Sequence, residues 1–92
     1  MKKLPVVCPS CESPLQVKAL YCVHCDTTVE GVFKLPVLAR LNPDDQAFAL
    51  AFIKASGSLK EMSALLNLSY PSVRNMLDDL IRQLQKLEDE NK

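Results

Sequence analysis

The hydrophobic pattern of the chain changes from alternating to helical between its first third and the remainder. Residues 15–21 (LQVKALY) alternate between apolar and polar positions, and residues 29–34 (VEGVFK) follow as a second candidate strand. Val6-Val7 forms a short third candidate. From Asn42 onward, apolar residues recur every three or four positions, which is the period of an amphipathic helix. The pattern therefore predicts a small β unit followed by an all-α unit.

The first helix is predicted to follow Asn42. This residue is a good N-cap, Pro43 is favourable at the first helical position, and two acids follow in the first turn. Gly57 lies where a glycine commonly ends a helix. The apolar face of this helix is expected to consist of Phe48, Ala51, Phe52 and Ala55.

Two further helices are expected, joined by a tight turn. Ser58 and Glu61 have the spacing of a capping box, which predicts the start of the second helix. We expect the turn at residues 67–69 to bury Leu68 and to lead into a third helix with Pro71 in its first turn. The positions of the second helix that should face inward are Leu59, Met62, Leu65 and Leu66.

Four cysteines precede residue 26, with the spacing C-x2-C-x10-C-x2-C. Two residues within each pair let a tight turn direct both thiolates at one ion, and the ten-residue insert is long enough for a hairpin that brings the second turn opposite the first. Four sulfurs complete a tetrahedron with no open position, which is a structural arrangement. A unit of about 35 residues is below the size that usually folds without a metal or disulfide. We therefore expect a structural Zn²⁺ ion bound by Cys8, Cys11, Cys22 and Cys25.

Other uses of these cysteines are less compatible with the sequence. Iron could occupy the same four-cysteine site, because the ligand set alone does not fix the metal. A redox dithiol would need a thioredoxin-like βαβ setting, which neither pair has, and two disulfides would need an oxidising compartment. His24 lies between the second pair, but four cysteines already fill the coordination shell, so we expect it to stay uncoordinated.

Charge and hydropathy restrict the partners and the location. Lys and Arg number 11, as do Asp and Glu, so the formal net charge is zero, which argues against binding polyanions through charge alone. No apolar run approaches the roughly 20 residues that span a bilayer, and the opening MKKLPVVC lacks the apolar stretch of a signal peptide. We expect a cytoplasmic protein without a membrane partner. With one His and no glycine-rich phosphate loop, neither an enzymatic activity nor a small-molecule substrate is expected.

Residues 60–84 (KEMSALLNLSYPSVRNMLDDLIRQL) resemble the helix-turn-helix of sigma-factor region 4 and of LuxR-type regulators, whose pattern is K-E-I-A-x-x-L-x-[LI]-S-x-x-T-V-R/K. The chain further resembles a bacterial family of unknown function that joins an N-terminal zinc ribbon to such a helix-turn-helix. That resemblance rests on CPSC–CVHC, VEGVFKLPVLARL and GSLKEMSALLNLSYPSVRNMLDDLI. The residues that match the helix-turn-helix pattern are Lys60, Glu61, Met62, Ser63, Leu66, Leu68, Ser69, Ser72, Val73 and Arg74.

Pattern and resemblance together predict a small mixed fold, in which a four-cysteine zinc ribbon of short antiparallel strands precedes an all-α three-helix domain. We expect the ribbon at 1–35, a linker at 36–41, the helix-turn-helix domain with a long third helix at 42–88, and a tail at 89–92. Zinc knuckles commonly place glycine after the second cysteine, where the backbone φ is positive. Glu12 and Asp26 take these positions here, and Asp tolerates that conformation better than Glu.

The resemblance implies a DNA-binding surface at the start of the third helix. In those regulators, the positions of Ser72, Arg74 and Asn75 face the major groove, where Arg pairs with guanine and Asn with adenine. Tyr70 can either stack on the DNA backbone or cover the turn. The candidate DNA contacts are therefore Ser72, Arg74, Asn75 and Tyr70, with Ser58, Lys60 and Ser69 near phosphates.

Two aspartates on the same helix face favour a protein partner over DNA. Asp78 and Asp79 would lie near DNA phosphates at an electrostatic cost, or they could form ion pairs, Arg74 with Asp78 and Asp78 with Arg82. DNA affinity depends largely on phosphate neutralisation, and the chain has few surplus cations. The first hypothesis is a transcription-associated regulator that binds DNA as a dimer. The second is an adaptor that docks on RNA polymerase, a sigma factor or another protein without contacting DNA.

The opposite face of the third helix carries an apolar heptad stripe, which is Val73, Leu77, Leu80, Leu84 and Leu87. Its first part must pack on the two preceding helices. Beyond about Leu80, the stripe could either extend the intramolecular core, covered by the ribbon, or form a homodimer. The candidate dimer contacts are Leu80, Leu84 and Leu87, and a dimer would double the cations that face a two-fold DNA site.

Overall fold

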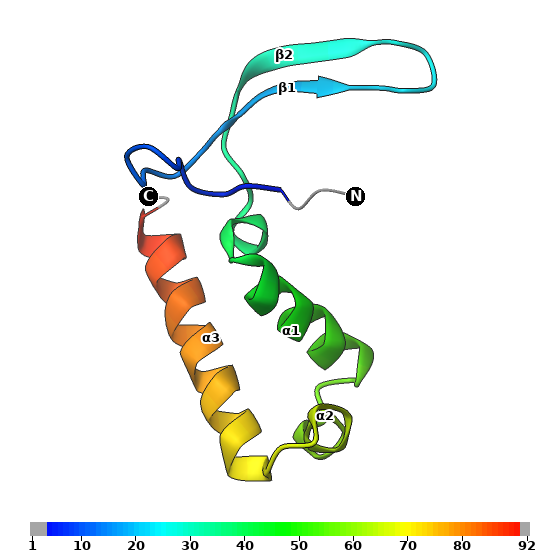
Figure 1. The fold of residues 1–92 in the computed structure, drawn as a ribbon, viewed down its shortest axis with the longest axis vertical. Helices are drawn as coiled ribbons and strands as arrows, with labels where there is room; N and C mark the ends of the chain where they lie inside the picture. The colour runs from blue at the N-terminus through cyan, green and yellow to red at the C-terminus, as the bar shows by residue number, and fades with distance from the viewer. Residues whose placement is uncertain (1–3, 91–92) are drawn as a thin grey trace.

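The computed structural model describes residues 4–90 and confirms the small mixed fold. Its elements are, in chain order, β1 (Val17–Tyr21), β2 (Thr28–Phe33), the 3₁₀ helix η1 (Val37–Arg40), α1 (Pro43–Lys54), α2 (Leu59–Leu66) and α3 (Tyr70–Glu90). Figure 1 shows the two-stranded hairpin at one end of the molecule, with α1 and α3 extending away from it and α2 at the far end. None of the described helices is long and apolar enough to cross a membrane.

The N-terminal unit is a hairpin without a core of its own. β1 pairs antiparallel with β2, from Tyr21 opposite Thr28 to Val17 opposite Phe33, with an irregularity between Val17 and Ala19. The expected third strand is reduced to a single antiparallel bridge between Val7 and Pro14. Neither strand contains a buried residue. Since an isolated two-stranded hairpin is at best marginally stable in water, this unit needs another source of stability.

The predicted helix boundaries are confirmed by side-chain caps. The Asn42 side chain accepts a hydrogen bond from the Asp45 amide at 2.8 Å, and the Ser58 hydroxyl accepts one from the Glu61 amide at 3.1 Å. Asn67 ends α2 in the left-handed conformation, with φ of 55°. These caps satisfy backbone groups that have no partner inside the helices.

The hydrophobic core belongs to the helical unit. It is formed by Leu41, Phe48, Ala55, Met62, Val73 and Leu80, with partly buried apolar residues around them. The prediction for α2 was correct at Met62, which is fully buried, and at Leu59, which packs against the core, but it was wrong at two leucines of α2, as was the prediction of a buried leucine in the turn that follows. Because α2 has only eight residues, one narrow face reaches α1 and α3. The leucines that remain exposed are Leu65, Leu66 and Leu68.

The segment expected to be a linker is packed structure. It contains η1 and ends at Leu41, which is among the most buried residues of the protein. The Gln46 side-chain amide donates to the carbonyl oxygens of Ala39 and Leu41, at 3.2 and 2.7 Å. At the C-terminal end of the chain, α3 continues through Glu90, so the expected tail is helical as far as the structure describes it, and residues 91–92 lie outside the described residues.

The heptad stripe of α3 faces the intramolecular core. Val73 and Leu80 are buried, and Leu77, Leu84 and Leu87 pack partly against the same cluster. Leu80 is only 5% exposed within one chain, whereas Leu84 and Leu87 are partly exposed, and the dimer contact expected at these three leucines stays a prediction. Leu80 is buried because the segment before α1 packs against α3. In that segment η1 contacts α3 and Leu41 joins the core, so this part of α3 is covered although α1 and α2 do not extend to it.

Candidate metal centre and nucleic-acid interface

The first cysteine pair lies in a tight turn. The Cys8 amide donates to the Ser13 carbonyl and the Glu12 amide donates to the Cys8 carbonyl, both at 2.8 Å. The Ser10 amide lies 3.4 Å from the Cys8 sulfur, as a weak donor to it. Glu12 has a φ of 63°, which confirms the expected positive φ after the second cysteine. A residue with a β-carbon is disfavoured in that region, so the turn contains backbone strain at Glu12.

The second pair repeats the same turn. The Cys22 amide donates to the Thr27 carbonyl and the Asp26 amide donates to the Cys22 carbonyl, again at 2.8 Å. Asp26 has a φ of 62°. The Tyr21 hydroxyl donates to the Asp26 carboxylate, which raises the pKa of the tyrosine. The two turns therefore have the same backbone hydrogen bonds and the same left-handed residue.

Hydroxyl side chains beside the cysteines favour the thiolate form. The Ser13 side chain is the main cause of a lowered pKa at the Cys11 thiol, and the Thr27 side chain is the main cause at the Cys25 thiol. The Thr27 hydroxyl oxygen lies 3.0 Å from the Cys25 sulfur. Thiolates are the form that binds metals, so each turn is suited to a soft cation such as Zn²⁺. Ser13 and Thr27 are not among the residues predicted from the sequence, although each stands two residues after a predicted ligand.

The structure brings the cysteines together as two pairs and keeps these pairs apart. Within residues 4–90, no three His, Cys, Asp or Glu side chains lie close enough to share a metal ion. In Figure 1 the first turn lies near the C-terminal end of α3, whereas the second turn forms the distal tip of the β1–β2 hairpin. A tetrahedral site with ligands from both turns therefore requires the hairpin to fold back toward the first turn. The donor set itself fits zinc, because both turns present paired thiols.

The helix-turn-helix candidates lie at the starts of α2 and α3. Lys60, Arg74 and Asn75 are solvent-exposed. The hydroxyl of Ser69 accepts from the Ser72 amide at 3.3 Å, and the two hydroxyl oxygens are 2.8 Å apart. Like the Ser58 hydroxyl, these groups are already used in helix capping.

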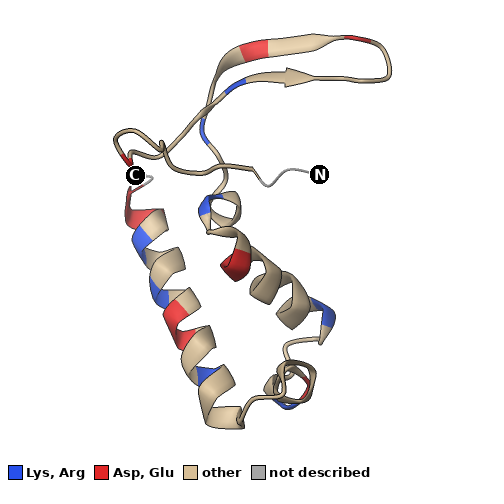
Figure 2. Cartoon of the chain, in the orientation of Figure 1, with Lys and Arg blue, Asp and Glu red and all other residues tan. Residues whose placement is uncertain are grey.

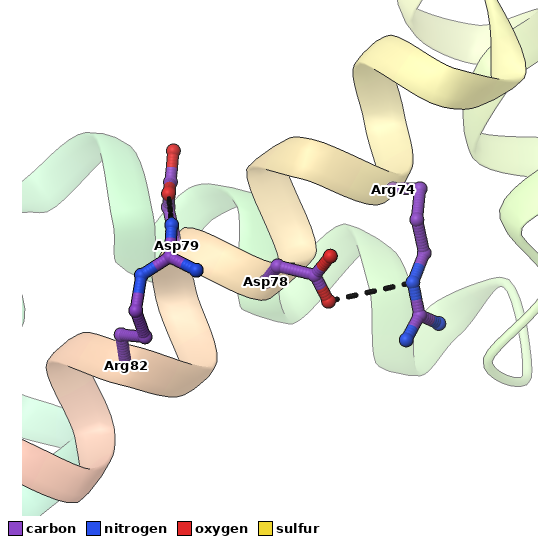
Figure 3. A network of polar contacts seen from close by, with 4 residues as sticks. All are labelled: Arg74, Asp78, Asp79 and Arg82. Carbon is purple, nitrogen blue, oxygen red and sulfur yellow. Dashed lines mark hydrogen bonds and ion pairs between the residues drawn. The ribbon is translucent and has the colours of Figure 1, made fainter.

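On the exposed face of α3, acidic and basic side chains form ion pairs with one another. Arg74 Nε lies 3.4 Å from Asp78 Oδ1, as expected, whereas Arg82 pairs with Asp79 and not with Asp78. Figure 3 shows the two pairs following one another along the helix. Exposed pairs of this kind contribute little to stability, but they compete with phosphates for both arginines.

Apolar side chains of α2, of the turn after it and of the first residue of α3 are also exposed. Leu65 is 71% exposed, and Leu68 and Tyr70 are also exposed. Tyr70 is 54% exposed, and its two expected roles, stacking on the DNA backbone or covering the turn, both stay predictions. Leu65 and Leu68 were expected in the core from their positions in the sequence. These positions do not show how much of a short helix the neighbouring helices can cover.

Two family models match the chain. The model of the DUF2089 zinc ribbon matches residues 8–39, and the model described as "Domain of unknown function (DUF2089)-HTH" matches residues 41–87. No curated protein matches, and no solved structure matches. The ribbon match and the two cysteine pairs make zinc the structural cofactor of the N-terminal unit. A zinc ribbon with a helix-turn-helix is typical of nucleic-acid-associated regulators without enzymatic activity. The chain belongs to the DUF2089 family, which joins a zinc ribbon to a helix-turn-helix domain.

Proposed function

We propose that this protein is a transcription regulator that binds DNA through α2 and the first two turns of α3. The observation that carries the proposal is the division of α3 into two faces. Val73 and Leu80 hold the helix on the core, while Arg74 and Asn75 project into solvent. A rigidly held helix with Arg and Asn on its outer face is suited to reading base edges in the major groove.

Each exposed side chain has a role that matches its chemistry. Arg74 can donate two hydrogen bonds to guanine, and Asn75 can pair with adenine. Lys60, at the start of α2, supplies a cation for a phosphate. The capping hydroxyls of Ser69 and Ser72 stand at the start of α3, where backbone amides also favour a phosphate.

The metal site is a scaffold for the N-terminal unit and not a part of the DNA-binding surface. We assign Cys8, Cys11, Cys22 and Cys25 as the zinc ligands, with the hairpin folded back so that both turns reach one ion. The ion replaces the hydrophobic core that the hairpin lacks. Four thiolates on Zn²⁺ carry two negative charges, so the ribbon is not the part of the protein that attracts DNA.

DNA binding is tested by the retention of zinc-loaded protein on mixed genomic DNA fragments at increasing salt. We expect binding that is detectable at low salt and weakens steeply as salt rises. Arg74→Ala should weaken binding by about tenfold or more, since a bidentate base contact contributes about 1–3 kcal/mol. Arg82→Ala is the matched control, because Arg82 is also exposed and ion-paired on α3 but lies two turns further on. The proposal is wrong if the protein is not retained even at low salt.

A second candidate function is a protein adaptor, which the exposed apolar groups Leu65, Leu68 and Tyr70 favour. Exposed apolar groups that form one contiguous patch on a protein surface commonly mark a docking site. Purified RNA polymerase, with and without a sigma factor, is the partner to test. Binding that is insensitive to salt, is lost with Leu65→Ser and persists with Arg74→Ala would favour this function over DNA binding.

A further inference from the structure

The cysteines of the ribbon are accessible to small molecules from the solvent. Three of the four are exposed, and Cys8 is half-buried. Every residue from Lys18 to Glu30 is exposed, and Figure 1 shows that the distal tip of the hairpin projects away from the helices. Protein packing therefore does not shield the sulfurs of the second turn from a reagent.

The two thiols of each turn are already neighbours. In both turns the carbonyl of the first cysteine accepts a hydrogen bond from the amide four residues further on, and residues three apart in such a turn stand on the same side of it. A hydrogen bond also joins the two thiols of each pair, which are Cys8 with Cys11 and Cys22 with Cys25. Each pair can therefore form a disulfide with little movement of its backbone.

Thiols of different turns are not neighbours. The two turns lie apart at opposite ends of the N-terminal unit (Figure 1), and within residues 4–90 no three metal-binding side chains are close enough to share an ion. A disulfide between the turns would hold the hairpin in the folded-back arrangement, whereas a disulfide within a turn leaves the hairpin as it is. The geometry therefore favours one disulfide in each turn over a disulfide that joins them.

The charge around the second turn indicates the class of oxidant. Residues 19–33 contain no Lys or Arg, and Figure 2 shows acidic but no basic residues on this part of the hairpin. An anionic oxidant would find no cation there to attract it. A small uncharged oxidant, namely a hydroperoxide, is the class that fits this surface.

We infer that the two cysteine pairs are a site of reversible oxidation by hydroperoxides, which closes one disulfide in each turn and releases the zinc ion. In each pair, one thiolate sulfur attacks the peroxide, the O–O bond breaks, and a sulfenic acid and a hydroxide ion form. The neighbouring thiolate then attacks the sulfenic sulfur, so that the S–S bond forms, the S–O bond breaks and a second hydroxide leaves. Two thiolates, one hydroperoxide such as H₂O₂ and two protons thus give one disulfide and two molecules of water, and the sulfurs lose the two electrons that the peroxide gains.

The neighbouring thiol keeps this oxidation reversible. A sulfenic acid that meets no second thiol is oxidised further to a sulfinic acid, which thiol reductants do not restore. A disulfide no longer supplies thiolates to the metal, so the ribbon loses the ion that stabilises it. The helical core contains no cysteine and keeps its packing. The redox state of the two pairs therefore controls the order of the ribbon and leaves the helix-turn-helix folded.

Treatment of the zinc-loaded full chain with about 1 mM hydrogen peroxide tests the inference. We expect loss of about one equivalent of zinc, measured with a chromogenic chelator. Peptide mapping by mass spectrometry should find both within-turn disulfides and should distinguish them from oxidised methionines. Helical circular dichroism should not change. Dithiothreitol followed by zinc should restore the metal content.

Single substitutions test whether the two pairs react independently. In Cys11→Ser, the disulfide between Cys22 and Cys25 should still form, while Cys8 should proceed to the sulfinic acid. Cys25→Ser is the matched variant for the second turn, where Cys22 should be over-oxidised and the first pair should close.

Three results would overturn the inference. These are zinc retained under peroxide, sulfinic acids in place of disulfides in the wild type, and disulfides that join the two turns in any of the three proteins. The release of zinc rests on the ligand assignment proposed above, and reduced protein that binds no zinc would overturn that assignment and the release together. Since no DNA is present, a failure here is distinguishable from a failure of the proposed DNA binding.

Discussion

Arg74 has a partner within the chain that competes with a nucleic acid. Its guanidinium lies beside the Asp78 carboxylate, and this exposed pair is worth only a few tenths of a kcal/mol. The pair can therefore open when a stronger acceptor approaches. The cost to DNA binding comes mainly from the aspartate itself, which would remain near the phosphates with its negative charge.

Asp78→Asn is expected to raise DNA affinity several-fold, because it frees Arg74 and removes one repelling charge. Asp79→Asn is the control, since it removes the same charge but leaves the Arg74 pair intact. Titration of fluorescent DNA at two salt concentrations measures both effects. Equal gains for the two variants would show that the Arg74–Asp78 pair itself has no influence.

Core and surface positions of α2 are expected to differ sharply in their effect on stability. Met62→Ala should lower the free energy of unfolding by about 2–5 kcal/mol, because the side chain is fully buried. Leu65→Ala, on the exposed side of the same helix, should change it by less than about 0.5 kcal/mol. Urea unfolding followed by circular dichroism compares the two. A large loss at Leu65 would mean that this leucine is covered in solution.

At the scale of the element, α2 depends on its ends. A helix of eight residues is too short to be stable by itself, so its caps and its packing on α1 and α3 both contribute. Ser58 caps its first turn and Asn67 ends it in the left-handed conformation. The geometry of the helix-turn-helix is therefore sensitive to residues that do not belong to its core.

Ser58→Ala is expected to lower the free energy of unfolding by about 1 kcal/mol, through the loss of the N-cap hydrogen bond. Ser58→Asp should retain most of the stability, because Asp is an equally good N-cap. If Ser58 also approaches a phosphate, Ser58→Asp should weaken DNA binding although the helix stays capped. Chemical denaturation and DNA titration on the same samples separate these two roles, and unchanged DNA binding by Ser58→Asp would remove Ser58 from the contact surface.

At the scale of the whole molecule, the two units differ in what stabilises them. All core residues of the helical unit lie between Leu41 and Leu87, whereas the strands of the hairpin bury none. Arg40 of η1 forms an ion pair with Glu90 at the end of α3, at 3.4 Å, and this contact also lies inside the helical unit. Zinc should therefore control the order of the ribbon and leave the helical fold largely unchanged.

Removal of the metal with a strong chelator is expected to abolish protection of the hairpin amides against hydrogen exchange, while the helical circular dichroism is retained. Cys22→Ser should give the same result without a chelator, and Ser10→Ala, which lies inside the first turn but supplies no ligand, should not. Elemental analysis of anaerobically purified protein should find about one equivalent of metal per chain, and it distinguishes zinc from iron. Loss of the helical signal together with the metal would show that the two units fold as one.

The sequence by itself determined the local structure and the donor chemistry. Caps at Asn42 and Ser58, the positive φ at Glu12 and Asp26, and the paired cysteines all follow from residue types within a few positions of one another. Only the tertiary structure decided which apolar residues are covered. Leu41 in the expected linker is buried, Leu80 lies in the core of a single chain, and Leu65 and Leu68 are exposed. A side chain is buried only if another element packs on its face of the helix. The lengths and directions of distant segments decide this, and the hydrophobic period of the sequence carries no information about them.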